Sequence, residues 1–336
     1  MAKYTEKPMI LLTGATGFLG RFIVDDLLAS GFEVRLLIRN AANRMLPWGD
    51  LVEVVDGDVN DPLALEQAME GVEAVIHAAA MVSFRKADQQ QMMHVNVQGT
   101  AEVVNACIEV GVPKLVHVSS IAAVGRTTDG SLINEQTPMQ NGQASSNYAT
   151  SKILAEREIQ RGVAEGLNAV MVNPGLILGP SDRWDQGTPK IFGTVAKGLA
   201  FYQSGENGLV GAVDVAKACR VLLHADVQPG SRYLLVGENW GYFKMLSTIA
   251  QKLGKKAPKY KIPRGVAITA GWLAETWAGL TGGDPIFTVE NMRSGTHHYR
   301  YDGSKIEALG FEYVPMEQII EDTAQKFLSQ HSVGQA

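Results

Sequence analysis

Cysteine is scarce in this sequence, since Cys107 and Cys219 are the only two among 336 residues. Two cysteines this far apart lack the close spacing of a zinc-binding set, and they are too few for a disulfide framework. The sequence therefore predicts no bound metal. Reduced thiols are typical of proteins that work in the cytosol, so we expect a cytoplasmic protein.

Long hydrophobic runs are also missing. No uninterrupted apolar stretch reaches the roughly 18 residues that a membrane-spanning helix needs. The nearest candidate, residues 266–280, contains Glu275 and fits an amphipathic helix better. Residues 1–7 are polar, so we expect neither a signal peptide nor a membrane span.

Charge of one sign is not in large excess either. The net charge is −5 and the pI is about 5.8, which predicts no footprint for nucleic acid or an anionic membrane surface. Hydrophobic residues make up 46% and charged residues 19%, as in an ordinary globular enzyme. The length predicts two domains, or one large domain with an insertion.

Glycine, by contrast, is placed where a dinucleotide would need it. The run Thr13-Gly14-Ala15-Thr16-Gly17-Phe18-Leu19-Gly20 lies between an expected strand at 9–12 and an expected helix at 18–28. The first glycine permits a tight turn, the second lets a pyrophosphate approach the backbone, and the third lets the helix pack on the strand. The free N–H groups of the helix N-terminus then bind the phosphates. We predict cofactor contacts along this run, at Thr13, Gly14, Thr16, Gly17, Phe18, Leu19 and Gly20.

The second expected strand, residues 32–38, ends at Arg39. An acidic residue about 20 positions after the glycine turn would bind the adenosine ribose of NAD, whereas an arginine accommodates the 2′-phosphate of NADP. Arg44 is close by, and no acid stands at the strand end. We therefore predict NADP rather than NAD, with a surface arginine that binds no ligand as the alternative.

Further strands are expected at 52–55, 73–77, 114–119 and 167–172, and each is followed by small or polar residues. Strands alternating with helices predict a Rossmann-type, doubly wound parallel sheet, whose ligand site lies at the carboxyl ends of the strands. His77, inside one of these strands, is expected to be a packed residue. The segments that this crevice collects are Asp58-Val59, Ala78-Ala79-Ala80, Ser119-Ser120 and Asn173-Pro174-Gly175.

Tyr148 and Lys152 are four residues apart on an expected helix at 146–165, so they share one face. An ammonium roughly 5 Å from a phenol, at an effective dielectric of about 20, stabilises the phenolate by roughly 3 kcal/mol. That corresponds to about two pKa units below the usual value of about 10. We therefore expect Lys152 to lower the pKa of Tyr148 towards the range that acid–base catalysis favours.

The glycine turn, the strand-end Ser120 and the Tyr148/Lys152 pair, in that order, resemble the extended short-chain dehydrogenase/reductases, also described as the NAD-dependent epimerase/dehydratase family. The serine loop, the Asn-Pro loop and the C-terminal half are most similar to the dihydroflavonol-reductase-like group. The resemblance implies NADP(H)-dependent interconversion of a ketone or aldehyde and an alcohol, with Tyr148 as acid and base. It further implies catalytic roles for Ser120 and Lys152, and for Asn96 within Asn-Val-Gln-Gly-Thr. By the same resemblance, Asp58 and Val59 lie beside the adenine, and Asn173, Pro174 and Gly175 face the nicotinamide carboxamide.

The expected domains are an NADP-binding Rossmann domain at 1–180, to which 212–237 returns, and a substrate lobe made of 181–211 and 238–336. Little regular structure is expected within 181–211, whose aromatic residues either line a substrate pocket or form the core of the lobe. A homodimer through helices at 87–110 and 146–165 is a further possibility by analogy. The aromatic residues in question are Trp184, Phe192, Phe201 and Tyr202.

Two other functions stay open. A nucleotide-sugar epimerase would need cations for a diphosphate, and a redox sensor would hold NADP without catalysis, although the Tyr148/Lys152 pair argues against it. The sugar-nucleotide dehydratases carry an Asp-Glu pair where this sequence has Ile121 and Ala122, which disfavours dehydration. The cations available to an epimerase are Arg183, Lys190, Lys197 and Arg293.

Overall fold

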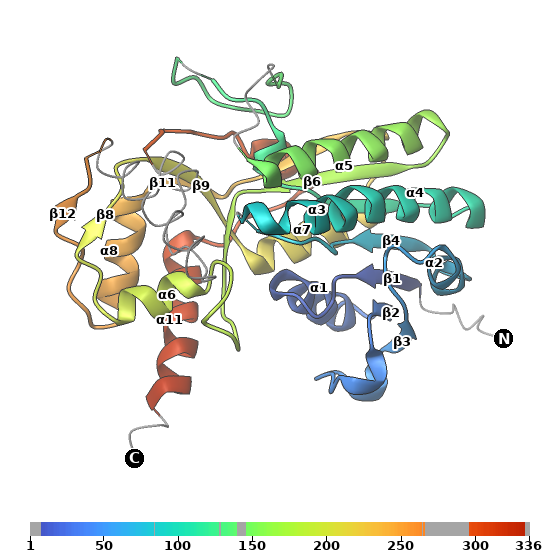
Figure 1. Ribbon diagram of the computed structural model, residues 1–336, viewed down its shortest axis with the longest axis horizontal. Coiled ribbons are helices and arrows are strands. Elements are labelled where there is room, and N and C mark those ends of the chain that lie inside the picture. Colours follow the sequence, from blue (N-terminus) through green and yellow to red (C-terminus); the bar gives the residue numbers. More distant parts are fainter. Residues whose placement is uncertain are drawn as a thin grey trace.

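The computed structural model describes residues 8–332 except 84, 128, 140–145, 264 and 266–295. Its centre is a seven-stranded sheet in the order β10-β6-β5-β4-β1-β2-β3, beside a three-stranded and a two-stranded sheet (Figure 1). The predicted doubly wound fold is therefore confirmed. Among the described residues, no helix is long and apolar enough to cross a membrane.

All neighbouring strands of the main sheet run parallel, so their carboxyl ends share one edge. Each predicted strand is present, with ends that differ by one or two residues. The segment expected to return to this sheet does so as β10, which pairs with β6. The strands are β1 (Met9–Thr13), β2 (Glu33–Ile38), β3 (Glu53–Asp56), β4 (Ala74–His77), β5 (Leu115–Val118), β6 (Ala169–Pro174) and β10 (Arg232–Leu235).

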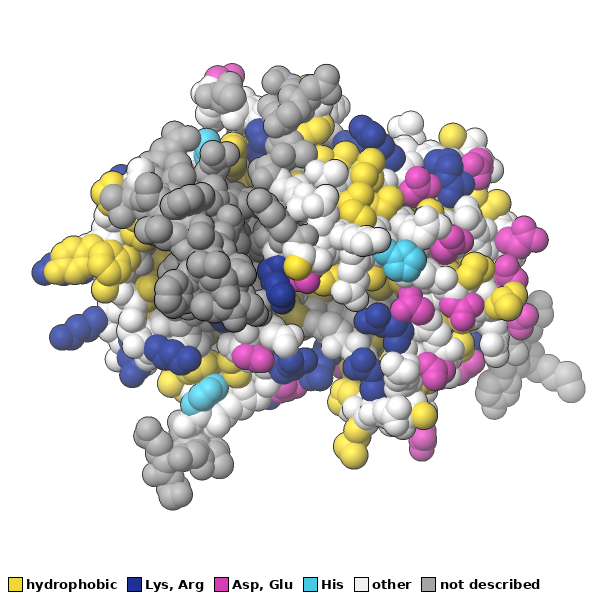
Figure 2. Space-filling view, viewed as in Figure 1, with side chains coloured by type: hydrophobic (Ala, Val, Ile, Leu, Met, Phe, Trp, Pro, Cys, Tyr) yellow, Lys and Arg dark blue, Asp and Glu magenta, His cyan; other side chains and the backbone are white. Residues whose placement is uncertain are grey.

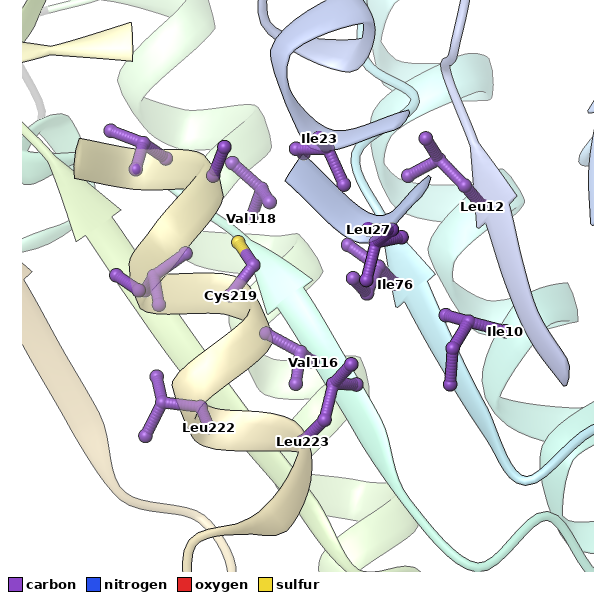
Figure 3. Packing of buried hydrophobic residues seen from close by; sticks show 14 of the residues in the cluster. Ile10, Leu12, Ile23, Leu27, Ile76, Val116, Val118, Cys219, Leu222 and Leu223 are labelled. Carbon is purple, nitrogen blue, oxygen red and sulfur yellow. The ribbon is translucent and has the colours of Figure 1, made fainter. Parts of the chain in front are cut away.

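Helices cover both faces of this sheet. On one face, α1 (Phe18–Ala29) and α7 (Ala212–His224) pack side by side on β1, β4 and β5, as the interlocking of Leu27, Cys219 and Ile76 shows (Figure 3). On the other face lie α2 (Pro62–Met69), α4 (Gly99–Val110) and α5 (Asn147–Ala164). Cys107 belongs to this second layer, so the sheet separates the two thiols and they cannot pair.

The segment expected as one helix from 87 to 110 is interrupted. It comprises a 3-10 turn (Lys86–Asp88), α3 (Gln89–Met93), a π-helical turn (His94–Gln98) and α4. A π turn widens a helix locally and is frequent at functional sites. Here it carries Asn96, whose buried amide bonds the backbone of Met81 on a neighbouring loop.

A smaller lobe follows β6. Its three-stranded sheet contains β7 (Leu176–Leu178), β9 (Glu206–Gly211) and β11 (Glu238–Gly241). Three helices pack against it, namely α6 (Lys190–Ala196), α8 (Tyr242–Lys252) and α11 (Met316–Ser332). At the outer edge of the lobe, β8 (Phe201–Tyr202) pairs with β12 (Tyr260–Lys261) (Figure 1).

The expectation of little regularity within 181–211 was wrong, because α6, β8 and β9 all lie there. These elements are two to seven residues long, too short for a periodic pattern to emerge. Of the aromatic residues left open, Phe192 is fully buried in the lobe core, and the Trp184 ring lies 6.2 Å from it. Phe201 is instead 55% exposed. The helix expected at 266–280 falls outside the described residues.

Candidate active site

The glycine turn is packed too tightly for side chains at two of its glycines. Gly14 has a φ of 83°, and a Cβ there would lie 2.6–2.8 Å from the backbone of Ala78 and Ala79. A Cβ on Gly20 would lie 2.2 Å from the Gly14 carbonyl oxygen. Gly17 differs, because the turn itself leaves it exposed on its outer side. The turn therefore rests on the loop after β4 and presents a bare backbone outward.

The N-terminus of α1 fits the pyrophosphate of a dinucleotide. Gly17 is its N-cap residue and has no side chain to cap the first N–H groups, and the first turn holds no acid. Uncapped N–H groups and the positive end of a twelve-residue helix form a ready anion site. Thr16 is exposed beside them, with Phe18 and Leu19 partly buried on the next turn. The predicted dinucleotide contacts therefore surround free backbone donors.

Thr13, also predicted to bind the cofactor, turns its side chain inward. Its hydroxyl accepts a hydrogen bond from the Ala79 N–H at 3.2 Å and lies 2.7 Å from His77 Nδ1. These bonds tie the glycine turn to the end of β4. Ala78 and Ala79 are partly buried, and Ala80 is exposed. Small residues here let the two loops meet.

Arg39 stands at the carboxyl end of β2 with its side chain 61% exposed. Its guanidinium lies 3.4 Å from a carboxylate oxygen of Asp58, which follows β3. Burial raises the pKa of Asp58, but hydrogen bonds from Asn60 and the charge of Arg39 outweigh it, so the pKa is lowered. Val59 is buried against Gly99 of the Asn96 segment. Arg39 and Asp58 thus lie together at the sheet edge where an adenosine would bind.

The row of catalytic candidates lies on one face of α5. Ser146 caps this helix by accepting from the Ala149 N–H at 2.7 Å, whereas Ser145 lies outside the described residues. Tyr148 and Lys152 follow at successive turns, and a third residue, Glu156, continues the same face. Glu156 was not among the predicted site residues, although it follows Lys152 at the same four-residue spacing.

The two serines after β5 point in different directions. Ser119 is buried, and its hydroxyl donates to Glu156 Oε1 at 2.5 Å. Ser120 caps a short 3-10 helix (Ile121–Ala123), and its side chain is hydrogen-bonded to Tyr148. Of the pair, Ser120 therefore adjoins the phenol.

The expected acidification of Tyr148 is not what the structure gives. Burial raises the pKa of Tyr148, and the hydrogen bond from Ser120 offsets this only in part. The Lys152 ammonium donates to the Val118 carbonyl at 3.0 Å. Burial lowers the pKa of Lys152 to about 8, with Glu156 acting in the opposite direction. The Coulomb energy at an effective dielectric of about 20 does not include the cost of desolvating the phenolate and the ammonium, and burial imposes that cost on both groups.

Two buried histidines lie close enough to Lys152 for its charge to affect their pKa values. His77 and His117 occupy facing positions on β4 and β5, with ring centroids 5.2 Å apart. Burial and the charge of Lys152 lower the pKa of His77 to about 3, and the pKa of His117 also falls well below its usual value. Both rings are therefore neutral at physiological pH, and neither adds a positive charge beside Lys152.

The hydrogen bonds of His77 fix its tautomer. The Thr100 hydroxyl donates to the Asn96 carbonyl at 2.7 Å, so it accepts from His77 Nε2–H at 3.0 Å. His77 Nδ1 then accepts from the Thr13 hydroxyl. This chain links the glycine turn to the π turn through the sheet. His77 is thus a packed strand residue that connects the two loops.

Asn96 uses its side chain to join three segments. Its Oδ1 accepts from the Met81 N–H at 2.7 Å, while Nδ2 donates to the Met81 carbonyl and to the Ser151 hydroxyl, each at 2.9 Å. Ser151 in turn donates to the Tyr148 carbonyl at 2.8 Å. The amide therefore holds the first turn of α5 against the loop after β4.

A buried carboxylate lies behind the catalytic row. Glu156 is 1% exposed and forms an ion pair with Arg232 of β10, whose Nε donates to Oε2 at 2.7 Å and whose Nη2 lies 2.6 Å from the same oxygen. Its other oxygen accepts from Asn173 Nδ2 at 2.6 Å, and that amide also donates to the Ser120 carbonyl at 3.0 Å. Asn173 thus turns inward at the end of β6, and Pro174 beside it is buried. Arg232 is 76 residues from Glu156, so no sequence signal predicted this pair.

Gly175 marks the crossing between the main sheet and the lobe, since a Cβ there would lie 2.4 Å from the Gly208 carbonyl oxygen. Two of the cations considered for a nucleotide-sugar diphosphate, Arg183 and Lys197, line one groove on the lobe. Arg183 lies 3.8 Å from Asp185, which lines the same groove. Lys190 begins α6, and Arg293 falls outside the described residues.

Comparisons with known proteins identify the family of this chain and relatives that share its fold. The model of the NAD dependent epimerase/dehydratase family matches residues 10–236. A relative from Synechocystis sp., provisionally named dihydroflavonol 4-reductase, is 29% identical over 332 residues, covering 94% of this chain and 93% of the relative. The crystal structure of gox2253 has a TM-score of 0.82 and 30% identity, covering 97% of this chain and 99% of that one. The UDP-glucose 4-epimerase of Thermus thermophilus, in complex with NAD, has a TM-score of 0.74 and 25% identity, covering 95% and 98%.

Proposed function

Because this chain belongs to the NAD dependent epimerase/dehydratase family, among the extended short-chain dehydrogenase/reductases, it is an oxidoreductase, and we propose that it interconverts a carbonyl compound and an alcohol with NADP(H). The observation that carries the proposal is the hydrogen bond between Tyr148 and Ser120, with Lys152 one helical turn away. These groups stand at the same edge of the sheet as the uncapped N-terminus of α1.

Each residue has a separate role in this proposal. When bound, the nicotinamide supplies or accepts the hydride. In the reductive direction, Ser120 donates a hydrogen bond to the substrate carbonyl oxygen, and Tyr148 transfers its proton to that oxygen. Lys152 would hold the nicotinamide ribose hydroxyls, and Asn96 positions the first turn of α5 through Ser151.

The raised pKa of Tyr148 suits the reductive direction. A phenol whose pKa lies above its ordinary value stays protonated at neutral pH and is ready to donate. Alcohol oxidation needs the phenolate instead, so it should require a higher pH. We therefore expect carbonyl reduction to be fastest near neutrality and alcohol oxidation to accelerate as the pH rises.

Arg39 supports the choice of NADP. It directly follows β2, where an arginine can accommodate a 2′-phosphate, and its side chain is largely exposed for such a contact. Thr16, Gly17, Phe18, Leu19 and the Ala78–Ala80 loop would border the rest of the dinucleotide. Asn173, Pro174 and Gly175 would stand on the nicotinamide side, where the inward amide of Asn173 orders the serine loop.

The test is to follow NADPH absorbance against panels of ketones, aldehydes, secondary alcohols and nucleotide sugars, with wild type and Tyr148→Phe. We expect Tyr148→Phe to lower kcat by about 10²–10⁴-fold, because the proton donor is lost. Its NADPH affinity, measured by fluorescence, should stay close to that of wild type.

Tyr313→Phe is a matched control, because the Tyr313 hydroxyl bonds the Gly303 carbonyl at 3.0 Å, away from the Tyr148–Ser120 pair. It should keep turnover. Substantial turnover by Tyr148→Phe would reject the assignment of this phenol as the proton donor.

A second candidate is a nucleotide-sugar epimerase, favoured by the likeness to the NAD-bound UDP-glucose 4-epimerase over nearly the whole chain. Epimerisation leaves no net change in the cofactor. Inversion of a nucleotide sugar without NADPH consumption would therefore replace the reductase proposal.

A further inference from the structure

The outer edge of the lobe carries an unusual group of exposed aromatic side chains. In the β8–β12 ribbon, Phe201 pairs with Tyr260, and their ring centroids are 5.7 Å apart. These side chains are 55% and 53% exposed. Phe243 at the start of α8 is 47% exposed, and its ring lies 4.7 Å from that of Tyr202. Because successive side chains of a strand point to opposite faces, Phe201 and Tyr260 form an exposed apolar strip on one face of the ribbon, whereas Tyr202 and Phe243 pair on the other.

Positive charge surrounds the strip. Residues 239–263, which run from β11 through α8 to β12, contain six lysines and no acidic residue. Lys255, Lys256, Lys259 and Lys261 are all exposed, and Lys259 Nζ lies 5.6 Å from the centre of the Tyr260 ring. The segment that leads into β8 adds Lys190 and Lys197. Lys197 and Lys255 line a groove that also contains Asp182 and Asp185, so the excess charge rests on Lys256, Lys259 and Lys261.

Acidic residues of the neighbouring helix neutralise only part of this positive charge. Glu321 of α11 pairs with Lys252 at 2.7 Å, towards the other end of α8 from Phe243. The whole-chain charge of −5 hides this local excess, because acidic residues elsewhere outnumber the basic ones. The prediction that no anionic membrane surface is bound was based on the net charge of the whole chain, which does not describe this local excess of lysine.

The protruding shape of this edge favours an anionic bilayer over single-stranded nucleic acid as the partner. Figure 2 shows hydrophobic side chains that protrude beside Lys and Arg side chains, at the end of the molecule where Figure 1 places β8 and β12. Single-stranded nucleic acid is usually held in a groove, whereas a bilayer accepts a protruding edge. Aromatic rings favour the headgroup level of a membrane, and lysines around them are attracted to anionic lipids.

We propose that the β8–β12 ribbon docks this protein onto a bilayer surface that contains anionic phospholipid, with Phe201 and Tyr260 at headgroup depth and the lysines on the lipid phosphates. Docking in this form is peripheral and reversible, since a few rings and lysines do not anchor a protein permanently. It holds the lobe against the membrane.

Co-sedimentation with sucrose-loaded vesicles tests the proposal directly. We expect the full chain to bind vesicles of equimolar phosphatidylcholine and phosphatidylglycerol, and to bind pure phosphatidylcholine vesicles far more weakly. Added salt should release it, because the attraction is electrostatic. Phe201→Ser should weaken binding about tenfold through lost apolar contact. Lys259→Gln should weaken it about fivefold, as expected for one surface lysine.

Matched variants elsewhere separate this edge from general surface effects. Leu63→Ser on α2 removes a side chain that is 77% exposed, and Arg157→Gln on α5 removes an exposed cation. Both should bind vesicles like wild type. Circular dichroism melting curves establish that all four variants are folded, and the assay needs no enzyme activity.

Three results would overturn the proposal. One is equal binding to anionic and neutral vesicles, or binding that neither ribbon variant changes. Another is a dimer that Phe201→Ser dissociates in a protein that does not bind vesicles, which would make the occupant a second copy of the chain. The last is tighter binding of a labelled oligo-dT than of anionic vesicles.

Discussion

The carboxyl edge of the main sheet and the outer edge of the lobe both contain several charged side chains, but these are buried and hydrogen-bonded at the first edge and exposed to solvent at the second. At the sheet edge, Lys152 and Glu156 are at most 3% exposed, and hydrogen bonds to Val118, Ser119, Asn173 and Arg232 engage them. Around the β8–β12 ribbon the lysines remain in water. A buried charge needs partners or a shifted pKa, whereas an exposed one needs neither.

This difference predicts where a substitution should change the stability of the protein and where it should change only the binding of a partner. The network behind Tyr148 links four segments of the chain, namely the glycine turn, the π turn, α5 and β10. One broken contact there leaves an unpaired group in a dry interior. Around the ribbon, each lysine acts nearly alone and mainly on a partner outside the protein.

The substitution expected to have the largest effect on stability, and so to test this comparison most directly, is Glu156→Gln. It removes the buried charge that Arg232 pairs with, and Arg232 is itself only partly exposed. Loss of one partner of a buried pair typically costs several kcal/mol, so we expect the free energy of unfolding to fall by about 3 kcal/mol. Urea denaturation of wild type and variant measures the change.

Lys259→Gln at the lobe edge provides the contrast and should change the free energy of unfolding by less than about 0.5 kcal/mol. If both substitutions proved equally mild, the buried network would not be the stabilising feature inferred here.

A second prediction concerns Lys152 and pH. Its pKa is about 8 in the folded protein, below the ordinary value of 10.5, because burial disfavours the ammonium. Between these two values the unfolded chain binds more protons, so the stability that this residue contributes rises with pH. Relative to Lys152→Met, wild type should gain about 2 kcal/mol of unfolding free energy between about pH 7 and pH 10.

Denaturant unfolding at several pH values tests this, because titrations common to both proteins cancel in the difference. A constant difference would show that Lys152 keeps an ordinary pKa. A difference that shrinks as the pH rises would show that its pKa is raised.

A third prediction concerns Arg39, which resembles the lobe lysines in its exposure. For Arg39→Ser we expect KM for NADPH to rise about tenfold, since a charge-assisted bond to an exposed phosphate is lost. KM for NADH should change little, so the second cofactor serves as the internal control. A clear preference of wild type for NADH would instead remove the NADP proposal.

Much of the fold followed from local patterns. The strands, α1 and the glycine turn are encoded by apolar runs and glycines within a few neighbouring residues, and the structure contains them. The π turn and the short elements within 181–211 escaped prediction. Asn96 widens its helix because it bonds Met81 on another segment, and the short elements form only when packed against one another.

The candidate site divides in the same way. Ser120, Tyr148 and Lys152 were identified from motif and spacing, and the structure brings Ser120 to Tyr148. The inward turns of Thr13 and Asn173, and the ion pair between Glu156 and Arg232, involve contacts between distant parts of the chain. No short stretch of sequence encodes such contacts.

The sequence by itself determined which chemical groups are available and in what order along the sheet, because strand, turn and helix signals are local. Only the tertiary structure decided their state. It desolvated the partly buried Tyr148 so that the pKa of this phenol rises, lowered the pKa of Lys152, and gathered lysines and aromatic rings at one end of an acidic chain. The physical reason is that desolvation and Coulomb energies depend on distances in space, which the sequence does not state.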